Sequence, residues 1–190
     1  MSIRRKRRSI RSPHQGSGRS YNRRSRQNKD QAGLTSVKTA LRYLLANHDR
    51  MLEERAHALM FLGELKALQQ FRTKLTGISY QRDAYSVYAD EISQTLDRMN
   101  LPSRSVYRGE HRVPVYDTRE VTEPEIQEKA RGVLDSVQEV TSGLSTDEIV
   151  EICRQVPEVR HAQLNHSIDL STMTDSGTIS HLRKQVEGKI

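Results

Sequence analysis

The chain has 190 residues, of which 34% are hydrophobic and 5% aromatic, with no Trp, one Cys and a net charge of +7. A chain of this length is too short for two full domains. Its hydrophobic content is small for its length, which indicates that part of the chain does not fold by itself or that a partner completes the core. A single Cys excludes a disulfide framework within the chain. No apolar run is long enough for a membrane span or a signal peptide, so we expect an intracellular protein of the nucleoid, nucleus or virion that is not secreted.

The positive charge is concentrated at the N-terminus. Residues 1–30 hold eleven Lys or Arg and one acidic residue, so they carry +10, whereas the other 160 residues hold 20 basic and 23 acidic groups and carry −3. Such a segment buries too little apolar area to offset the entropy lost on ordering, and its like charges repel one another. We therefore predict that residues 1–33 form a disordered, Arg-rich arm.

The arm is expected to bind nucleic acid. Nine of its cations are Arg, whose planar guanidinium forms paired hydrogen bonds to phosphate and stacks on bases. Phosphate contacts do not read base sequence, so no sequence specificity is implied. The composition of the arm also does not decide between RNA and DNA. The run from Arg4 to Arg8 also has the pattern of a nuclear-import signal. Binding of the arm to an anionic membrane or to an acidic protein is a further alternative. The expected nucleic-acid-binding residues are Arg4, Arg5, Lys6, Arg7, Arg8, Arg11, Arg19, Arg23, Arg24, Arg26 and Lys29.

Residues 34–101 have the pattern of a long helical hairpin. Apolar residues recur at helical spacing from Val37 to Leu62, which predicts a long amphipathic helix capped by Thr35 or Ser36. Residues 58–62 are apolar all round, which indicates either a kink at Gly63 or burial on several sides. A second helix is expected from about residue 79 to 101, and its inner face comprises Tyr85, Tyr88, Ile92, Leu96 and Met99.

This hairpin is too narrow to form a full core by itself. We therefore expect a homo-oligomer, or a helical protein partner, that covers the apolar stripe of the first helix. The expected self-association residues are Leu41, Leu45, Leu52, Leu59 and Leu62.

Residues 102–121 are predicted to be a linker or exposed arm. Alternation within residues 112–116 allows a short edge strand. Arg104, Arg108 and Arg112 form a second, weaker basic stretch, and the interleaved Tyr107 and Tyr116 are able to stack on bases.

Residues 122–190 are predicted to be a C-terminal helical subdomain. Thr122 to Glu125 and Ser145 to Glu148 each have the pattern of a capping box before an apolar helical face, and Pro157 ends the second of these helices. Residues from 179 to 190 return to helical spacing. Apolar and polar residues alternate within 164–170, which allows a strand there. The expected fold class is therefore mainly α, and the alternative is an α+β fold for residues 144–190.

No enzyme motif is present in the sequence. Cys153, His161 and His166 form the one group with ligand chemistry, but their spacing matches no common zinc pattern, so we expect no metal, no cofactor and no catalysis. The leading hypothesis is a nucleic-acid-binding structural protein, capsid-, nucleocapsid- or nucleoid-like, that self-associates through helices and tethers RNA or DNA with its arm. The alternatives are an RNA-binding subunit of a large ribonucleoprotein, which would be monomeric when free, and a helical protein-interaction adaptor.

Overall fold

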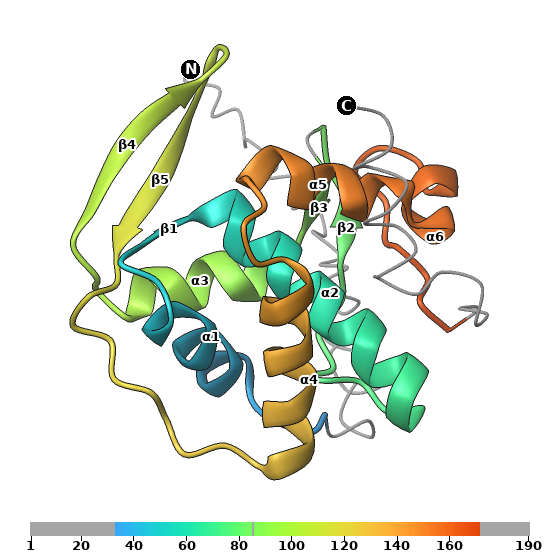
Figure 1. Ribbon diagram of the computed structural model, residues 1–190. Coiled ribbons are helices and arrows are strands. Elements are labelled where there is room, and N and C mark those ends of the chain that lie inside the picture. The colour runs from blue at the N-terminus through green and yellow to red at the C-terminus, as the bar shows by residue number, and fades with distance from the viewer. Residues whose placement is uncertain (1–32, 85, 172–190) are drawn as a thin grey trace, which may run out of the picture. The chain divides into compact units, whose positions relative to one another are not determined.

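The computed structural model describes residues 33–84 and 86–171 (Figure 1). Residues 1–32 of the predicted arm, Tyr85 and the expected C-terminal helical residues from 179 to 190 lie outside the described residues. The described elements are α1 (Val37–Ala46), β1 (Arg50–Leu52), α2 (Glu53–Phe71), β2 (Gln81–Arg82), β3 (Val87–Tyr88), α3 (Asp90–Arg98), β4 (Ser103–Arg108), β5 (His111–Asp117), α4 (Glu128–Val140), α5 (Thr146–Gln155) and α6 (Pro157–His161).

About 49% of the structure is helical and 15% is strand, in a mixed α/β fold with two small sheets. The prediction of a mainly α fold built on a long helical hairpin is therefore wrong. One sheet has the order β1-β5-β4, the other pairs β2 with β3, and all these pairings are antiparallel. An isolated bridge joins Gln81 to Ser167, but residues 164–170 form no strand, so the strand that the α+β alternative expected there is absent.

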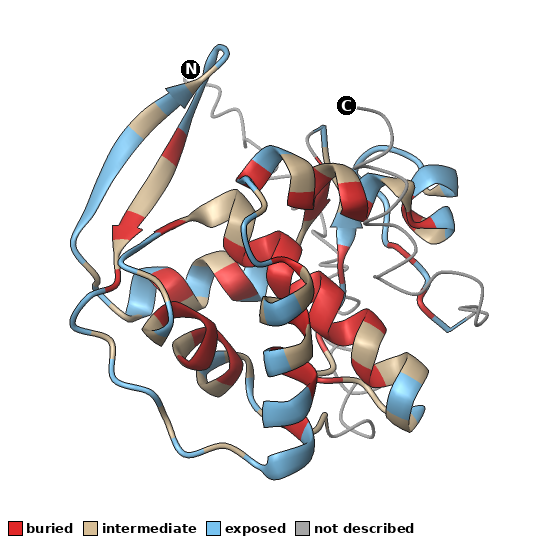
Figure 2. Ribbon diagram, in the orientation of Figure 1, coloured by how far each residue is buried: buried red, intermediate tan, exposed pale blue. Residues whose placement is uncertain are grey.

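The helix α2 forms the centre of the core. Eleven of its 19 residues are buried, and it contacts α1, α3, α4, α5 and both sheets. Figure 2 shows the buried residues running along α2 and the surfaces of its neighbours that face it. The helix is continuous through Gly63, so of the two alternatives for the apolar run at 58–62, burial on several sides is the one confirmed.

The long first helix predicted from Val37 is interrupted. α1 ends at Ala46, and the next ordered element is the strand β1, whose Met51 lies opposite Tyr116 of β5. Asn47 donates a side-chain hydrogen bond to the carbonyl of Tyr43, 3.0 Å away, and its backbone N–H also caps the helix end. Asn is a poor helix former because its side chain competes for backbone groups, and pairing with β5 then favours extended backbone.

The second predicted helix starts eleven residues late, because β2 and β3 pair with each other before it and α3 begins only at Asp90. Asp83 explains the hairpin. Its carboxylate accepts the N–H of Ser86 at 2.6 Å, and its own N–H donates to the Ser86 carbonyl at 3.2 Å. This side-chain-to-backbone bond stabilises a turn rather than a helix.

The predicted linker at 102–121 is largely an ordered β-hairpin. β4 and β5 pair from Ser103 opposite Tyr116 to Arg108 opposite His111. Gly109 has φ +60° at the first position of the two-residue turn, as in a type II′ hairpin. The short strand expected at 112–116 is therefore present, but it is the central strand of its sheet, and β1 and β4 are the edges.

The two predicted capping boxes have different outcomes. Ser145 and Glu148 form the expected reciprocal bonds, and α5 begins there. Thr122 does not cap a helix, because its hydroxyl and carbonyl oxygens accept hydrogen bonds from Arg42 at 2.8 and 3.2 Å. α4 consequently begins only at Glu128. Pro157 ends α5 as expected, but it also occupies the first turn of α6.

Candidate nucleic-acid interface

The folded region begins at Gly33, next to the segment predicted to bind nucleic acid. Leu34 and Thr35 donate backbone hydrogen bonds to the carbonyls of Lys74 and Leu75, at 3.0 and 2.9 Å. A Cβ at position 33 would lie 2.6 Å from the Leu75 carbonyl oxygen, so this close approach requires glycine. The eleven predicted nucleic-acid-binding residues, from Arg4 to Lys29, lie outside the described residues.

The described residues are acidic as a group. Residues 33–84 and 86–171 hold 17 Lys or Arg and 21 Asp or Glu, a net charge of −4. The charge that gives the chain its pI of about 9.7 is therefore carried outside this folded region.

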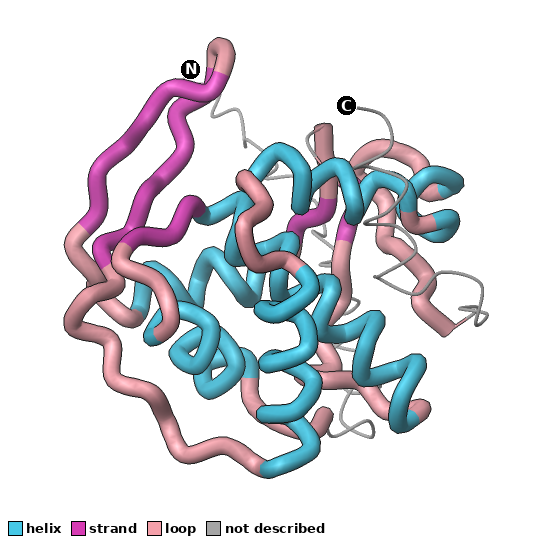
Figure 3. Tube along the Cα trace, in the orientation of Figure 1, coloured by secondary structure: helices cyan, strands magenta, loops and turns pink. Residues whose placement is uncertain are grey.

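Within the folded region, the β4–β5 hairpin displays the second basic stretch. Figure 3 shows the two strands extending as a ribbon beyond the helices. Tyr107 is 74% exposed and lies directly opposite Arg112 in the antiparallel ladder, so both side chains belong to one face of the ribbon. Arg104 and Arg112 are also exposed. An exposed aromatic ring stacks on an unpaired base, and a neighbouring guanidinium contacts the phosphate of that nucleotide.

Arg108 and Tyr116 have structural roles instead. The guanidinium of Arg108 lies 3.1 Å from the carboxylate of Glu54 and also pairs with Asp147, so it ties the ribbon to the starts of α2 and α5. Burial raises the pKa of Glu54, and the nearby Arg108 opposes that rise. Tyr116 is only 5% exposed, and burial raises the pKa of its hydroxyl to about 12. Of the basic and aromatic residues predicted here, three remain accessible.

The predicted self-association residues lie mainly inside the fold. Leu41, Leu45, Leu59 and Leu62 are at most 1% exposed and belong to one core, whereas Leu52 is half-buried in β1. The apolar stripe is thus covered by other parts of the same chain, above all α4, α5 and the sheets. A second copy cannot contact these four side chains without unfolding the core.

A buried polar cluster, missed by the sequence analysis, joins α2 to α3. His57 Nδ1 accepts the N–H of Ala89 at 3.2 Å, so Nε2 carries the ring proton and donates to Ser93 Oγ at 3.1 Å, and Ser93 donates to Glu53. Each group already has its partner, and the imidazole presents no lone pair to the serine. The cluster therefore positions α3 and does not activate a nucleophile. The spacing of Glu53 and His57, one helical turn, was its visible signal.

Two members of this cluster, Glu53 and His57, line a hollow of about 260 Å³. Tyr88 stacks on the His57 ring with 4.8 Å between centroids. Its polar lining also includes Glu54, Asp83 and Arg112, and its apolar lining includes Val87, Val113 and Val150.

The group of Cys153, His161 and His166 is not brought together as a site. Cys153 is fully buried in α5, its thiol lies 3.7 Å from the Ala58 carbonyl, and burial raises its pKa. Both histidines are exposed. Across residues 33–84 and 86–171, no three His, Cys, Asp or Glu side chains are placed to hold a metal ion. None of the helices in that same part of the chain combines the length and apolarity needed to cross a membrane.

No family model matches the chain, and no curated protein or solved structure shows significant similarity to it.

Proposed function

We propose that this protein binds nucleic acid through the Arg-rich segment of residues 1–33. The observation that carries the proposal is the separation of charge, +10 on residues 1–30 against −4 on the described residues. An acidic folded region repels phosphate, so a basic segment is needed for attachment to a polyanion. Nine Arg side chains supply donors whose geometry matches phosphate oxygens.

The proposal is for a tethering role without catalysis. In the cluster of His57, Ser93 and Glu53, the imidazole presents no lone pair to the serine, which favours binding over reaction. Association through the leucine stripe is not part of the proposal, because four of those leucines lie in the core. If the free protein is a monomer, the hypothesis of a ribonucleoprotein subunit is favoured. A virion or nucleoid protein would need a self-association surface other than the leucine stripe.

The ribbon supports a second, weaker contact. Tyr107, Arg104 and Arg112 are exposed on it. Base stacking requires unpaired bases, so this contact favours single strands over duplex.

The test compares matched sets of four Arg-to-Gln substitutions by fluorescence anisotropy across a salt series, with one RNA and one DNA of equal length. The first set replaces Arg4, Arg5, Arg7 and Arg8, and the second replaces Arg19, Arg23, Arg24 and Arg26. Each set should reduce the magnitude of the negative slope of log K against log salt by about 0.7 per lost contact on single strands, or by about 0.9 on duplex. Lys129→Gln, on the folded region, is the control and should leave the slope unchanged.

Both sets should reduce affinity to a similar degree, because phosphate contacts do not read sequence. Slopes equal to that of the wild type for both sets would show that residues 1–33 do not supply the contacts. If only one set reduces affinity, and only for one of the two nucleic acids, that part of the segment contains a specific recognition motif.

A further inference from the structure

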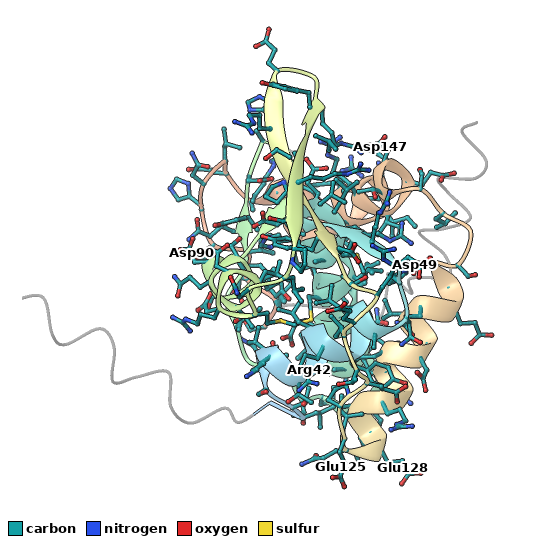
Figure 4. All side chains as sticks on the ribbon, turned by 90° about the vertical axis from the view of Figure 1, so that its left-hand side faces the viewer. Arg42, Asp49, Asp90, Glu125, Glu128 and Asp147 are labelled. Atoms are coloured by element: carbon teal, nitrogen blue, oxygen red, sulfur yellow. The ribbon has the colours of Figure 1, made fainter. Side chains whose placement is uncertain are left out.

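A hollow of about 870 Å³ lies on the folded region, away from the ribbon's tip. Its wall is formed by α1, by the end of α3 and by the segment that follows β5. Figure 4 shows this side of the molecule, with Arg42 labelled on α1. The residues that line it are Lys38, Arg42, Arg98, Met99, Asn100, Leu101, Pro102, Asp117, Arg119, Glu120, Val121 and Thr122.

Positive charge dominates this hollow although the folded region is acidic. Four cations and two carboxylates line it. One carboxylate, Asp117, is already engaged, because Arg119 donates two hydrogen bonds to it and thereby lowers its pKa to about 2. Lys38, Arg42 and Arg98 remain, and no carboxylate within residues 33–84 and 86–171 forms an ion pair with them. Glu120 is the single opposing charge on the wall.

Two of these cations repel each other. Lys38 and Arg42 are one helical turn apart on α1, and that helix contains no acidic residue. Like charges at this spacing destabilise a helix, and a bound anion would remove the repulsion. This spacing was visible in the sequence, but the approach of Arg98 and Thr122 depends on the tertiary fold.

Arg42 is already oriented for binding. Its Nη2 donates to the carbonyl and hydroxyl oxygens of Thr122, which holds the guanidinium in place. The Nε and Nη1 donors are not used in those bonds. A planar fork fixed on one side loses little entropy when its other side binds an oxyanion.

The hollow also has an apolar wall. Met99, Leu101, Pro102 and Val121 line it beside the cations. A volume of about 870 Å³ lies within the range of small-molecule sites, roughly 300–1,000 Å³. A ligand with both an anionic group and a flat apolar part matches this lining better than a bare anion does.

We propose that this hollow binds a nucleotide, with its phosphate at Lys38, Arg42 and Arg98 and its base against the apolar wall. The nucleotide is either a free molecule or one unit of a single strand. Binding of a free nucleotide does not depend on residues 1–33, so this proposal goes beyond the function proposed above and fails or holds separately from it.

The test is calorimetric titration of the full-length chain with adenosine monophosphate, adenosine and inorganic phosphate. The key variant combines Lys38→Gln with Arg98→Gln, since neither side chain bonds to the core. Its matched control combines Lys129→Gln with Arg160→Gln, two exposed cations outside the hollow. The wild type should bind the monophosphate at least tenfold more tightly than adenosine or phosphate. The key variant should lose roughly tenfold, and the control less than about twofold.

A second arm of the test uses a single-stranded decanucleotide with the protein in which Arg4, Arg5, Arg7 and Arg8 are Gln. If adding Lys38→Gln and Arg98→Gln to that protein weakens its binding of the decanucleotide, the hollow binds one unit of a single-stranded nucleic acid. Weaker monophosphate binding supports it as a free-nucleotide site. Unchanged affinity for both ligands would overturn the proposal, as would tighter binding of inorganic phosphate than of the monophosphate. Circular dichroism and the thermal midpoint verify that each variant is folded.

Discussion

Replacing Glu64 with Gln tests how the start of the folded region is held in place. Glu64 is fully buried in α2, and its carboxylate accepts the N–H of Leu75 at 2.7 Å, the N–H of Thr76 at 2.9 Å and the hydroxyl of Thr76. The same loop accepts the backbone N–H groups of Leu34 and Thr35. One buried side chain therefore supports the junction with residues 1–32.

The amide has the shape of the carboxylate but one acceptor fewer. Its oxygen can accept both Thr76 donors, and its nitrogen then faces the N–H of Leu75, which loses its partner. A buried N–H left without a partner costs about 1–3 kcal/mol, so we expect Glu64→Gln to destabilise the protein by that amount in mildly acidic solution. A protonated carboxyl oxygen still accepts a hydrogen bond, whereas an amide nitrogen does not.

The difference should shrink as the pH rises. Burial raises the pKa of Glu64, and the three hydrogen bonds only partly oppose that rise. A carboxyl whose folded-state pKa is raised costs nothing below its unfolded pKa, about 4.3, and destabilises the fold progressively as the pH rises through the folded pKa. Gln does not titrate. The advantage of the wild type over Glu64→Gln is therefore largest near pH 4 and declines above it.

Urea denaturation of both proteins at pH 4, 5, 6 and 7 measures this difference directly. Hydrogen exchange at the amides of Leu34 and Thr35 should also accelerate in the variant, because the loop that accepts them loses its support. Equal stability at every pH would refute the reasoning from the unpaired Leu75 N–H. An advantage of the wild type that grows with pH would refute the assigned direction of the Glu64 pKa.

Three further predictions concern the junction, a helix start and the ribbon. Gly33→Ala should destabilise by about 1–3 kcal/mol in thermal unfolding, because its Cβ would lie 2.6 Å from the Leu75 carbonyl oxygen, and an unchanged midpoint would contradict this. Ser145→Ala should cost about 1 kcal/mol by removing the capping box with Glu148, whereas Ser145→Asp, which restores an acceptor, should cost less. Tyr107→Ala should change stability by under about 0.5 kcal/mol but weaken single-strand binding by about 1–3 kcal/mol, while Tyr107→Phe, which keeps the ring, should bind like the wild type in anisotropy.

Where sequence-based prediction succeeded, the information was local. The capping box of Ser145 and Glu148 involves residues three apart, so both of its reciprocal bonds are made within a single turn of the chain. The strand at 112–116 was predicted from the alternation of apolar and polar residues alone. For the apolar run at 58–62, one of the two alternatives read from the sequence, burial on several sides, was confirmed.

Where it failed, the deciding partner was distant in the chain. Met51 is extended because it pairs with Tyr116, which is 65 residues away, and helical periodicity carries no information about that pairing. Thr122 has the sequence pattern of a helix cap, but Arg42, 80 residues earlier, occupies its hydroxyl oxygen. The turn at Asp83 is the exception, since a side-chain bond to Ser86 three residues later was a readable local feature.

The sequence by itself determined the charge separation on which the proposed function is based, because charge and composition are properties of a segment that need no partner. It also determined the capping box of Ser145 and Glu148, at which α5 begins. Only the tertiary structure decided that the leucine stripe is core rather than interface, since burial depends on which elements cover a face. Only the tertiary structure placed Arg98 on the wall of the same hollow as Lys38 and Arg42, because a hollow lined by several elements exists only once long-range packing has positioned them.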